Sequence, residues 1–386
     1  MISYGKQSID QSDIDSVVNV LKGDWLTQGP SVEKFEADLK EYFNAKSACA
    51  VSSGTAALHL TGLALGWSKD DIIITTPITF LASVNSIIYS GAVPDFVDID
   101  MTSFTIDLNK LEDKIKSYME INKKVKAVIA VDYAGHPCDW EGLRNIADKY
   151  NIQLINDNCH ALGAEYNGDK KYAVKYADVV IHSYHPVKHI TTGEGGAILS
   201  NNNLLDEKVR LLRNHGMTKD SKKLINNDGP WYYEMHDVGY NYRITDIQCA
   251  LGSNQLSKLD FFVQKRRDIA KIYNKDLSNI LSIQTPKNNS QIGHAYHLYP
   301  LLIDFSQFSI DKVNFFNRLI KLGISLQVHY IPIHLQPYMK KKYGFKKGDF
   351  SLSEEFYKKE ISLPIYPDLN NNELNFVIDS IIKILK

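Results

Sequence analysis

Between about residues 45 and 200, short and almost continuous apolar runs alternate with longer segments whose apolar residues recur at helical spacing. Continuous short runs are typical of strands buried on both faces, and the longer segments are typical of helices packed on them. The pattern therefore predicts an α/β fold with a mainly parallel sheet covered on both faces. The expected strands are residues 48–51, 72–75, 93–99, 125–131, 152–156, 178–182 and 197–200, and the expected helices are 55–65 and 80–89.

The pattern changes beyond residue 245. Thr245 and Gln248 have the spacing of a capping box, and apolar residues from Ile247 to Val263 fit one helical face, which predicts one long helix that starts there. The remainder mixes strand and helix signals and predicts a smaller α+β domain. We place the boundary inside the long helix, which gives a large domain at residues 1–255 and a small C-terminal domain at 256–386. In the small domain the expected strands are 296–303 and 325–329, and the expected helices are 312–322 and 374–385.

Length and composition agree with this division and exclude several classes of protein. The 386 residues exceed the roughly 250–300 that one core usually holds. A net charge of −1 without a basic block makes nucleic acid an improbable partner. The polar N-terminus and the absence of a long apolar run predict neither a signal peptide nor a membrane span. The four cysteines lack C-x-x-C spacing, so we expect no zinc site and a cytoplasmic protein with reduced thiols.

Lys188 is the first candidate for chemistry. It lies in a turn between the expected strands 178–182 and 197–200, and a polar Thr-Thr-Gly-Glu-Gly-Gly segment follows shortly after it. A lysine held on a turn between buried strands can be desolvated and aimed, which is what Schiff-base chemistry requires.

Asp157 is the second candidate, because it follows the expected strand 152–156 at its carboxyl end. A buried carboxylate there can pair with a protonated pyridine nitrogen and keep the ring cationic. The alternative is that Asp157 caps the next turn, which by itself is the commoner role. With Lys188 at another strand exit downstream, we favour a site for pyridoxal 5′-phosphate (PLP).

Further residues fit a PLP site, each with a plain structural alternative. Residues 52–56 (Ser-Ser-Gly-Thr-Ala) join an expected strand to an expected helix, where free N–H groups can bind a phosphate, although ordinary capping gives the same pattern. Ser183 could add a hydroxyl to that phosphate site. His160 could bind the phenolic oxygen of the cofactor, or be a buried core residue. Phe80 could stack on the pyridine ring, or simply belong to the core.

Three histidines, His182, His185 and His189, are close together in sequence. The first lies on an expected strand and the other two flank Pro186, so nothing in the pattern brings them together. We therefore predict no metal site.

At this point the chain resembles a known family along nearly its whole length. The segments SSGTAALHL, TPITFLASVN, FVDID, INDNCHALGAEY, SYHPVKHITTGEGGAI and VGYNYRITDIQCALG occur in the order typical of sugar aminotransferases of the DegT/DnrJ/EryC1/StrS family. The resemblance implies a PLP-dependent aminotransferase of fold type I. It also implies a homodimer in which both subunits contribute to each active site.

The resemblance also implies a role for individual residues. Lys188 matches the lysine that binds the cofactor covalently and acts as base and acid, and Asp157 matches the partner of the pyridine nitrogen. His160 stands where many members have Gln. The remaining matches are Gly54, Thr55, Ala56 and Ser183 as phosphate contacts, Phe80 as the stacking ring, and Asn241 as a phosphate contact from the other subunit.

A finer likeness concerns the segments VDYAGHPCD, HALGAEY, NHGM, QVHYIPIHLQPYM and ISLPIYPDL. They are similar to one branch of the family, which implies transfer of the amino group of L-glutamate to C4 of a UDP-linked 4-keto-6-deoxy-N-acetylhexosamine in pseudaminic acid biosynthesis. Residues 1–30 would form a substrate loop. The substrate contacts implied are Tyr4, Trp25, Leu26, Thr27, Gly54, Ser183, Asn241, His329, Tyr330 and Ile331.

Two alternatives remain open at this point. One is an aminotransferase that makes a different UDP- or dTDP-linked amino sugar, and the other is a PLP-binding regulator without turnover. Family members that carry histidine in place of the lysine are dehydratases, so the presence of Lys188 favours transamination. For Arg243, binding of a donor carboxylate or substrate phosphate and a surface ion pair remain equal alternatives.

Overall fold

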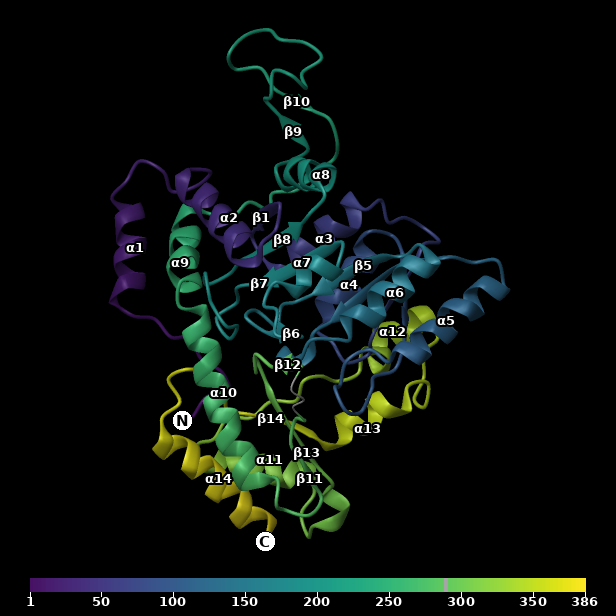
Figure 1. The fold of residues 1–386 in the computed structure, drawn as a ribbon, viewed down its shortest axis with the longest axis vertical. Coiled ribbons are helices and arrows are strands. Elements are labelled where there is room, and N and C mark those ends of the chain that lie inside the picture. The colour runs from purple at the N-terminus through teal and green to yellow at the C-terminus, as the bar shows by residue number, and fades with distance from the viewer. Residues whose placement is uncertain (288–290) are drawn as a thin grey trace.

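A seven-stranded sheet forms the centre of the N-terminal part of the chain in the computed structural model, which describes residues 1–287 and 291–386 (Figure 1). The strand order is β1-β8-β7-β5-β4-β2-β3. All seven strands predicted above are present, with ends within three residues of those expected. Their bounds are β1 (Ser47–Val51), β2 (Ile72–Thr75), β3 (Val93–Phe96), β4 (Val125–Val131), β5 (Gln153–Asp157), β7 (Val179–Ser183) and β8 (Gly196–Ser200).

The sheet is mainly parallel, as predicted. The pairs from β7 through β5, β4 and β2 to β3 are parallel, and β8 runs antiparallel to both β7 and β1. The carboxyl ends of β5 and β7 therefore meet at one edge of the sheet, which is where ligands gather in such folds.

Helices cover both faces of the sheet because successive strand residues point to opposite sides. Ile72 and Ile74 belong to one hydrophobic cluster, while Ile73 between them belongs to another. The first cluster includes residues of α2 (Pro30–Phe43), α5 (Leu108–Glu120), α6 (Trp140–Tyr150), α7 (Tyr172–Tyr176) and α9 (Asp246–Leu256), and the second includes residues of α3 (Gly54–Ala64), α4 (Leu81–Tyr89) and α8 (Asn203–Arg213). The expected helices 55–65 and 80–89 correspond to α3 and α4.

The single long helix predicted from Thr245 is wrong in one respect, because the structure divides it. The capping box of Thr245 and Gln248 is present and starts α9, but α9 ends at Leu256 and α10 (Leu259–Leu277) follows. At the break the Ser257 hydroxyl donates to the carbonyl of Asn254. Lys258 Nζ pairs with the carboxylates of Asp10, which caps α1 (Gln11–Leu21), and of Asp13 in the first turn of that helix. A hydroxyl that binds a preceding helical carbonyl bends or ends helices.

A second core lies under the C-terminal strands. Tyr273 and Leu277 near the end of α10 pack there, whereas Leu259 and Phe262 near its start pack on the large sheet. Ile2 also belongs to this second core, so the extreme N-terminus packs with the C-terminal region. The division at residue 256 stays a prediction. The elements here are β11 (Ile283–Gln284), β13 (Tyr299–Ile303), β14 (Glu360–Leu363), α11 (Lys312–Lys321), α12 (Pro337–Tyr343), α13 (Ser351–Lys359) and α14 (Asn371–Leu385).

Residues 325–329 do not form the strand that was predicted. Gln327 makes an isolated bridge to Ser362 on β14, and the chain continues irregularly past His329. The expected helices 312–322 and 374–385 correspond to α11 and α14, and the strand expected at 296–303 is the shorter β13.

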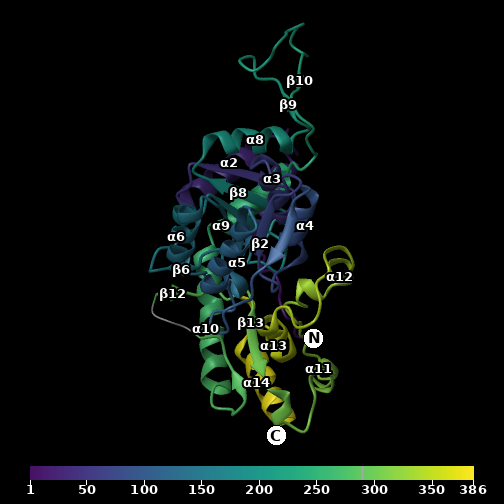
Figure 2. The ribbon, with the colours of Figure 1, turned by 90° about the vertical axis from the view of Figure 1, so that its right-hand side faces the viewer.

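A two-stranded ribbon, β9 (Met217–Thr218) with β10 (Glu234–Met235), extends away from the rest of the molecule beyond α8 (Figures 1 and 2). A second small pair joins β6 (Glu165–Tyr166) to β12 (Ile292–Gly293). Short 3-10 helices occur at Tyr133–Gly135, Phe305–Gln307 and Ile333–Leu335. Within the described residues, none of the helices has the length and apolar character needed to cross a bilayer.

Candidate active site

A cavity of about 430 Å³ opens beyond the carboxyl ends of β5 and β7 and holds Lys188 and Asp157 together. The same cavity is bounded by the N-terminus of α3, the start of α4 and two segments of the C-terminal region. Its volume falls in the range of small-molecule sites. The predicted residues that line it are Tyr4, Gly54, Thr55, Phe80, Asp157, His160, Ser183, Lys188, His329 and Tyr330.

Lys188 lies in the connection between β7 and β8, as predicted. Its Nζ is 3.5 Å from Nε2 of His297. Burial lowers the pKa of Lys188, and the nearby charge of Arg266 acts in the same direction, while Cys159 and Asp157 raise it. A lysine with a lowered pKa carries a larger fraction of neutral amine at neutral pH, which suits a nucleophile and base.

Asp157 ends β5 and is only 6% exposed. Its Oδ2 accepts a hydrogen bond from the Ser83 hydroxyl at 2.7 Å, and its Oδ1 accepts one from the Cys159 N–H at 3.3 Å. The turn-capping role considered above is thus present in part. This buried carboxylate, fixed by two hydrogen bonds, suits the neutralisation of a cationic group in the cavity.

The N-terminus of α3 forms the other end of the cavity. The hydroxyl of Ser53 caps the helix by accepting the N–H of Ala56 at 3.0 Å, so this N–H is used inside the protein. A Cβ at Gly54 would lie 2.9 Å from Cβ of Ser183, so the space beside these backbone N–H groups requires glycine. Helix N-termini bind anions, and a narrow space at Gly54 and Thr55 suits a phosphate.

His160 lines the cavity, and both of its ring nitrogens make hydrogen bonds. Nδ1 accepts the N–H of Ala134 at 3.4 Å, so Nε2 carries the proton and donates to the hydroxyl of Tyr330 at 3.1 Å. Burial holds the pKa of His160 well below its usual value. The contact with the phenolic oxygen of a cofactor stays a prediction.

Another wall of the cavity comes from the N-terminal segment and from the C-terminal region. Tyr4, His329 and Tyr330 line it, and the rings of Tyr4 and His329 lie 5.5 Å apart. The ring of Phe80 is half exposed and lies 6.0 Å from that of Tyr330, across the mouth of the cavity. This arrangement leaves an aromatic rim above the polar floor.

Several predicted residues do not line this cavity. Trp25 and Leu26 are about half exposed, and their loop is tied to α9 by Asp246, whose carboxylate accepts the N–H groups of Gly29 and Ser31. Asn241 is exposed and bridges to Asn214. The structure does not bring these residues to Lys188 within one chain, and their roles stay predictions. The same applies to Ala56, Thr27 and Ile331.

Arg243 does not line this cavity. Its guanidinium donates to the side chain of Asn214 at 2.7 Å. No carboxylate among the described residues pairs with it, so neither of the two roles considered above is decided.

Some residues at or behind the cavity wall were not foreseen. His297 lies beside Lys188, and Ser83 binds Asp157, with Thr79 hydrogen-bonded to Ser83 at 2.8 Å. The i, i+4 spacing of Thr79 and Ser83 around the start of α4 was a signal in the sequence that these two side chains meet. His297 offered none, because it precedes β13 in a part of the chain far from the recognised segments. The other lining residues are Ser53, Leu58, Ala82, Val131, Cys159, His185, Val187 and Glu194.

The histidines 182, 185 and 189 do not converge. His182 is buried with its ring 4.5 Å from that of Phe43, His185 is exposed at the cavity, and His189 bonds the carbonyl of Ala295. Across the described ranges 1–287 and 291–386, no group of three or more His, Cys, Asp or Glu residues is placed to hold a metal ion.

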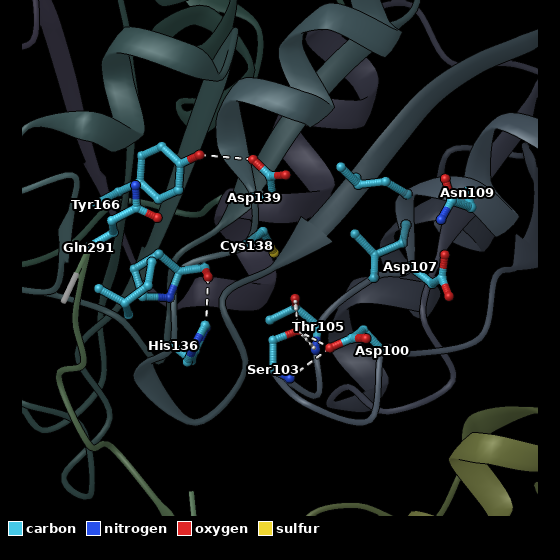
Figure 3. Close-up of a pocket in the computed structure, with 14 residues that line it drawn as sticks. Asp100, Ser103, Thr105, Asp107, Asn109, His136, Cys138, Asp139, Tyr166 and Gln291 are labelled. Carbon is cyan, nitrogen blue, oxygen red and sulfur yellow. Dashed lines mark hydrogen bonds between the residues drawn. The ribbon is translucent and has the colours of Figure 1, made fainter. Parts of the chain in front are cut away.

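A second cavity of about 410 Å³ lies near α5 and α6 and carries three aspartates (Figure 3). Each of these carboxylates already serves the local backbone. Asp107 and Asp139 cap α5 and α6, and Asp100 accepts the N–H groups of Thr102 and Ser103. Figure 3 shows Tyr166 reaching Asp139 across one side of this cavity, where its hydroxyl donates at 2.8 Å. These bonds account for the aspartates without a ligand.

Comparison with known proteins shows the family to which this chain belongs. The model of the DegT/DnrJ/EryC1/StrS aminotransferase family matches residues 7–382. A relative from Campylobacter jejuni subsp. jejuni serotype O:23/36, UDP-4-amino-4,6-dideoxy-N-acetyl-beta-L-altrosamine transaminase, is 41% identical over 386 residues, which cover 100% of this chain and 98% of that protein.

Solved structures give the same result. PseC of Helicobacter pylori, an aminotransferase of pseudaminic acid biosynthesis, aligns with a TM-score of 0.90 at 33% identity, over 100% of this chain and 99% of that chain. Spr1654 of Streptococcus pneumoniae in its PLP form aligns with a TM-score of 0.88 at 27% identity, over 100% of both chains. The mainly parallel sheet and these neighbours agree with the predicted aminotransferase fold type I. The chain belongs to the DegT/DnrJ/EryC1/StrS family and is an aminotransferase whose cofactor is PLP.

Proposed function

We propose that this enzyme transfers the amino group of L-glutamate to C4 of a UDP-linked 4-keto-6-deoxy-N-acetylhexosamine, giving UDP-4-amino-4,6-dideoxy-N-acetyl-β-L-altrosamine for pseudaminic acid biosynthesis. The observation that carries the proposal is the 41% identity to the Campylobacter transaminase along the whole chain. The likeness to PseC in fold supports it independently.

The residues of the Lys188 cavity fit PLP. The space beside Gly54 that a Cβ would fill suits its phosphate, Asp157 suits its ring nitrogen, and Lys188 suits its carbonyl carbon. When bound, PLP supplies an electron sink that stabilises negative charge on the carbon next to the amino group.

The chain's own residues then have separate tasks. Asp157, held by Ser83, keeps a negative charge at the floor of the cavity. Lys188 Nζ takes the proton from the reacting carbon and returns it. General acid–base catalysis of this kind accelerates a reaction by about 10²–10⁴-fold. The aromatic rim of Tyr4, Phe80 and Tyr330 limits access of water to these groups.

A homodimer with shared active sites is part of the proposal. The segment from α8 to residue 238 includes the extended β9–β10 ribbon (Figure 1). It carries several exposed apolar side chains. Such side chains mark surfaces that another chain covers. Asn241 follows this segment and does not line its own chain's cavity, which fits a residue that serves the neighbouring subunit. The exposed side chains are Leu204, Ile225, Trp231, Tyr233, Met235 and Val238.

Mixing of two inactive variants tests the shared site. Lys188→Ala and Asn241→Ala subunits would each be inactive alone, while their heterodimer would hold one intact site. After subunit exchange at equal amounts we expect about a quarter of the wild-type activity, because half of the dimers would be mixed. Recovery of no activity from a verified heterodimer would contradict sharing.

A cytoplasmic location also belongs to the proposal. All four cysteines are free, and Cys49, Cys138 and Cys249 are buried as thiols. Burial raises the pKa of the Cys49 thiol to about 12, so this residue stays protonated and inert.

Two half-reactions test the main proposal. L-Glutamate should convert the cofactor spectrum of the purified enzyme, and only an accepted keto sugar should restore it. The 4-keto products of a 5-inverting and a non-inverting UDP-GlcNAc dehydratase would be supplied in parallel, and the amino sugar identified by NMR. Restoration only by the non-inverted sugar, or only by a dTDP-linked keto sugar, would assign a different product. Binding of PLP without conversion by glutamate would instead favour the non-catalytic regulator.

A further inference from the structure

Three side chains form a hydrogen-bonded chain from the wall of the active-site cavity into the interior. Nδ1 of His329 lies 2.8 Å from Oγ of Ser362, and that hydroxyl lies 2.5 Å from Oε1 of Glu360. Oε2 of Glu360 also accepts the backbone N–H of His329 at 3.0 Å. Ser362 and Glu360 belong to β14 and are fully buried, whereas His329 lines the cavity.

The outer end of this chain is available to a ligand. Nε2 of His329 has no hydrogen-bond partner in the part of the chain that the structure describes, and the ring faces the cavity beside Tyr4. The backbone of His329 is held on both sides, because Glu360 accepts its N–H and the Tyr133 hydroxyl donates to its carbonyl. The position of the ring is thus set by the protein, and only its hydrogen is free to change.

The number of hydrogens permits two arrangements, because Ser362 has one hydroxyl hydrogen and neutral imidazole has one N–H. With Glu360 ionised, Ser362 donates to Glu360 and therefore accepts from Nδ1–H of His329, which leaves Nε2 as an acceptor. With Glu360 protonated on Oε1, Glu360 donates to Ser362 and Ser362 donates to Nδ1. Nε2 then carries the hydrogen and is a donor.

We propose that Glu360 is a positioning residue that acts through Ser362 to set the tautomer of His329, and thereby decides whether His329 Nε2 accepts a hydrogen bond from the substrate or donates one to it. The change between the two arrangements balances. One proton enters from the cavity at Nε2, the Nδ1 proton passes to Ser362, and the Ser362 proton passes to Glu360. The net result is one proton gained by the carboxylate.

Both states of Glu360 are accessible near neutral pH. Burial raises the pKa of Glu360, and the charge of Lys312 on α11 opposes this rise without contact. Lys312 itself donates to the carbonyl of Tyr357 and has a pKa lowered by burial. The other ionisable groups that Glu360 affects are the phenols of Tyr133 and Tyr330, whose pKa values burial raises well above their usual range. They therefore stay neutral.

His329 stays neutral in both arrangements. Burial lowers the pKa of His329 to about 3, and the charge of Lys188 acts in the same direction. Its hydrogen-bonding role toward a ligand is therefore decided by its tautomer and not by its charge. This rests on the proposed function in one respect, since the ligand is taken to be a sugar nucleotide. Such a ligand offers hydroxyl and amide donors to the acceptor form, and carbonyl or phosphate oxygens to the donor form.

The tautomer can be observed without turnover. In PLP-loaded enzyme with ¹⁵N-labelled histidine, two-bond ¹H–¹⁵N spectra distinguish Nδ1–H from Nε2–H, and His329→Asn identifies the signal. Between about pH 6 and about pH 9 we expect the wild-type signal to change from Nε2–H to Nδ1–H. Glu360→Gln, whose amide donates to Ser362 at every pH, should stay Nε2–H throughout. The same tautomer in wild type and Glu360→Gln at every pH would overturn the proposal.

Kinetics give the second readout. Ser362→Ala removes the connection, so we expect KM for the keto sugar to rise about fivefold, as for one lost hydrogen bond, with kcat changed less than twofold. The KM of wild type should depend on pH, and that of Glu360→Gln should not. Glu354→Gln is the matched control, because Glu354 is a buried carboxylate bonded to His334 outside the cavity. If Glu354→Gln changed KM and its pH dependence as much as these variants do, a specific role of Glu360 and Ser362 would be contradicted.

The two proposals can fail separately. If wild type reacts with glutamate but with none of the keto sugars, the proposed substrate is wrong, and the tautomer measurement still decides the role of Glu360. If the enzyme accepts the keto sugar but the His329 signal is the same in wild type and Glu360→Gln, the positioning role is wrong and the proposed function stands.

Discussion

The two walls of the active-site cavity are held in different ways. On the sheet wall, Gly54, Asp157, Ser183 and Lys188 lie at strand ends, on a helix N-terminus or on the turn between two strands. On the C-terminal wall, formed by His297, His329 and Tyr330, buried side chains such as Glu360, Ser362 and Tyr133 hold the His329 segment. The sheet wall therefore follows from backbone structure, and the C-terminal wall from contacts between distant side chains.

The walls also differ in charge. The sheet wall carries the carboxylate of Asp157 and the amine of Lys188, while burial keeps the histidines of the C-terminal wall neutral by lowering the pKa values of His297 and His329. From this difference in charge we expect a division of roles, in which the residues of the sheet wall carry out the chemistry and those of the C-terminal wall orient the ligand. The following substitutions test that division.

Lys188→Ala should have the largest effect. It removes the amine that, in the proposed function, attaches the cofactor and moves the proton, so we expect turnover to fall by at least about 10⁴-fold. Rates of the glutamate half-reaction and the cofactor spectrum measure this. Lys170→Ala, which removes an exposed lysine paired with Asp260, should leave the rate unchanged. A rate near wild type for Lys188→Ala would exclude its assigned role.

Asp157→Asn should have the next largest effect. Asparagine keeps the shape and can still accept from Ser83, but it loses the negative charge at the cavity floor. We expect kcat to fall by about 10²–10³-fold, a magnitude typical of lost electrostatic stabilisation, with binding of glutamate less affected. The matched control is Asp178→Asn. Asp178 comes just before β7, at the amino end of that strand, and its carboxylate binds Arg144 and the N–H of Leu154. A similar loss in both variants would mean that the effect is structural.

His297→Phe tests whether the C-terminal wall also takes part in the chemistry. It keeps a ring beside His160, 4.3 Å away, but removes the nitrogen 3.5 Å from Lys188 Nζ. We expect kcat to fall by about two- to tenfold, the worth of one hydrogen bond, and His297→Gln to recover part of it. His136→Gln, at the cavity of Figure 3, should leave kcat unchanged. A loss as large as that of Asp157→Asn would break the division between the walls.

Glu360→Gln should have the smallest effect on kcat, because its main effect is on stability. The raised pKa of Glu360 means that the folded protein holds this proton more tightly than the unfolded chain, so its contribution is complete at low pH and declines as pH rises. Between about pH 5 and about pH 7, wild type should lose up to about 1.4 kcal/mol per pH unit of unfolding free energy relative to Glu360→Gln. Denaturant unfolding at several pH values measures this. A difference that does not depend on pH would show that Glu360 ionises normally.

Much of the sheet wall was readable in the sequence. The strand before Asp157, the turn around Lys188 and the Ser-Ser-Gly-Thr segment before α3 are local patterns, and parallel topology brings the carboxyl ends of strands together. The resemblance to the family added the roles of these residues. The helix break at residues 257–258 was missed because it depends on ion pairs between Lys258 and two aspartates at the start of α1, far away in the sequence.

The sequence by itself determined the central sheet and the helices on its faces, and it pointed to Lys188 and Asp157 as candidates, because each follows from apolar periodicity or from a residue at a strand end. Only the tertiary structure placed His297 beside Lys188 and connected His329 to Glu360 through Ser362. These residues are separated by long stretches with no common periodicity. His329 meets Ser362 because the chain at Gln327 bridges to β14, and His297 precedes β13, which pairs with β14. Burial there alters their pKa values, which local sequence does not encode.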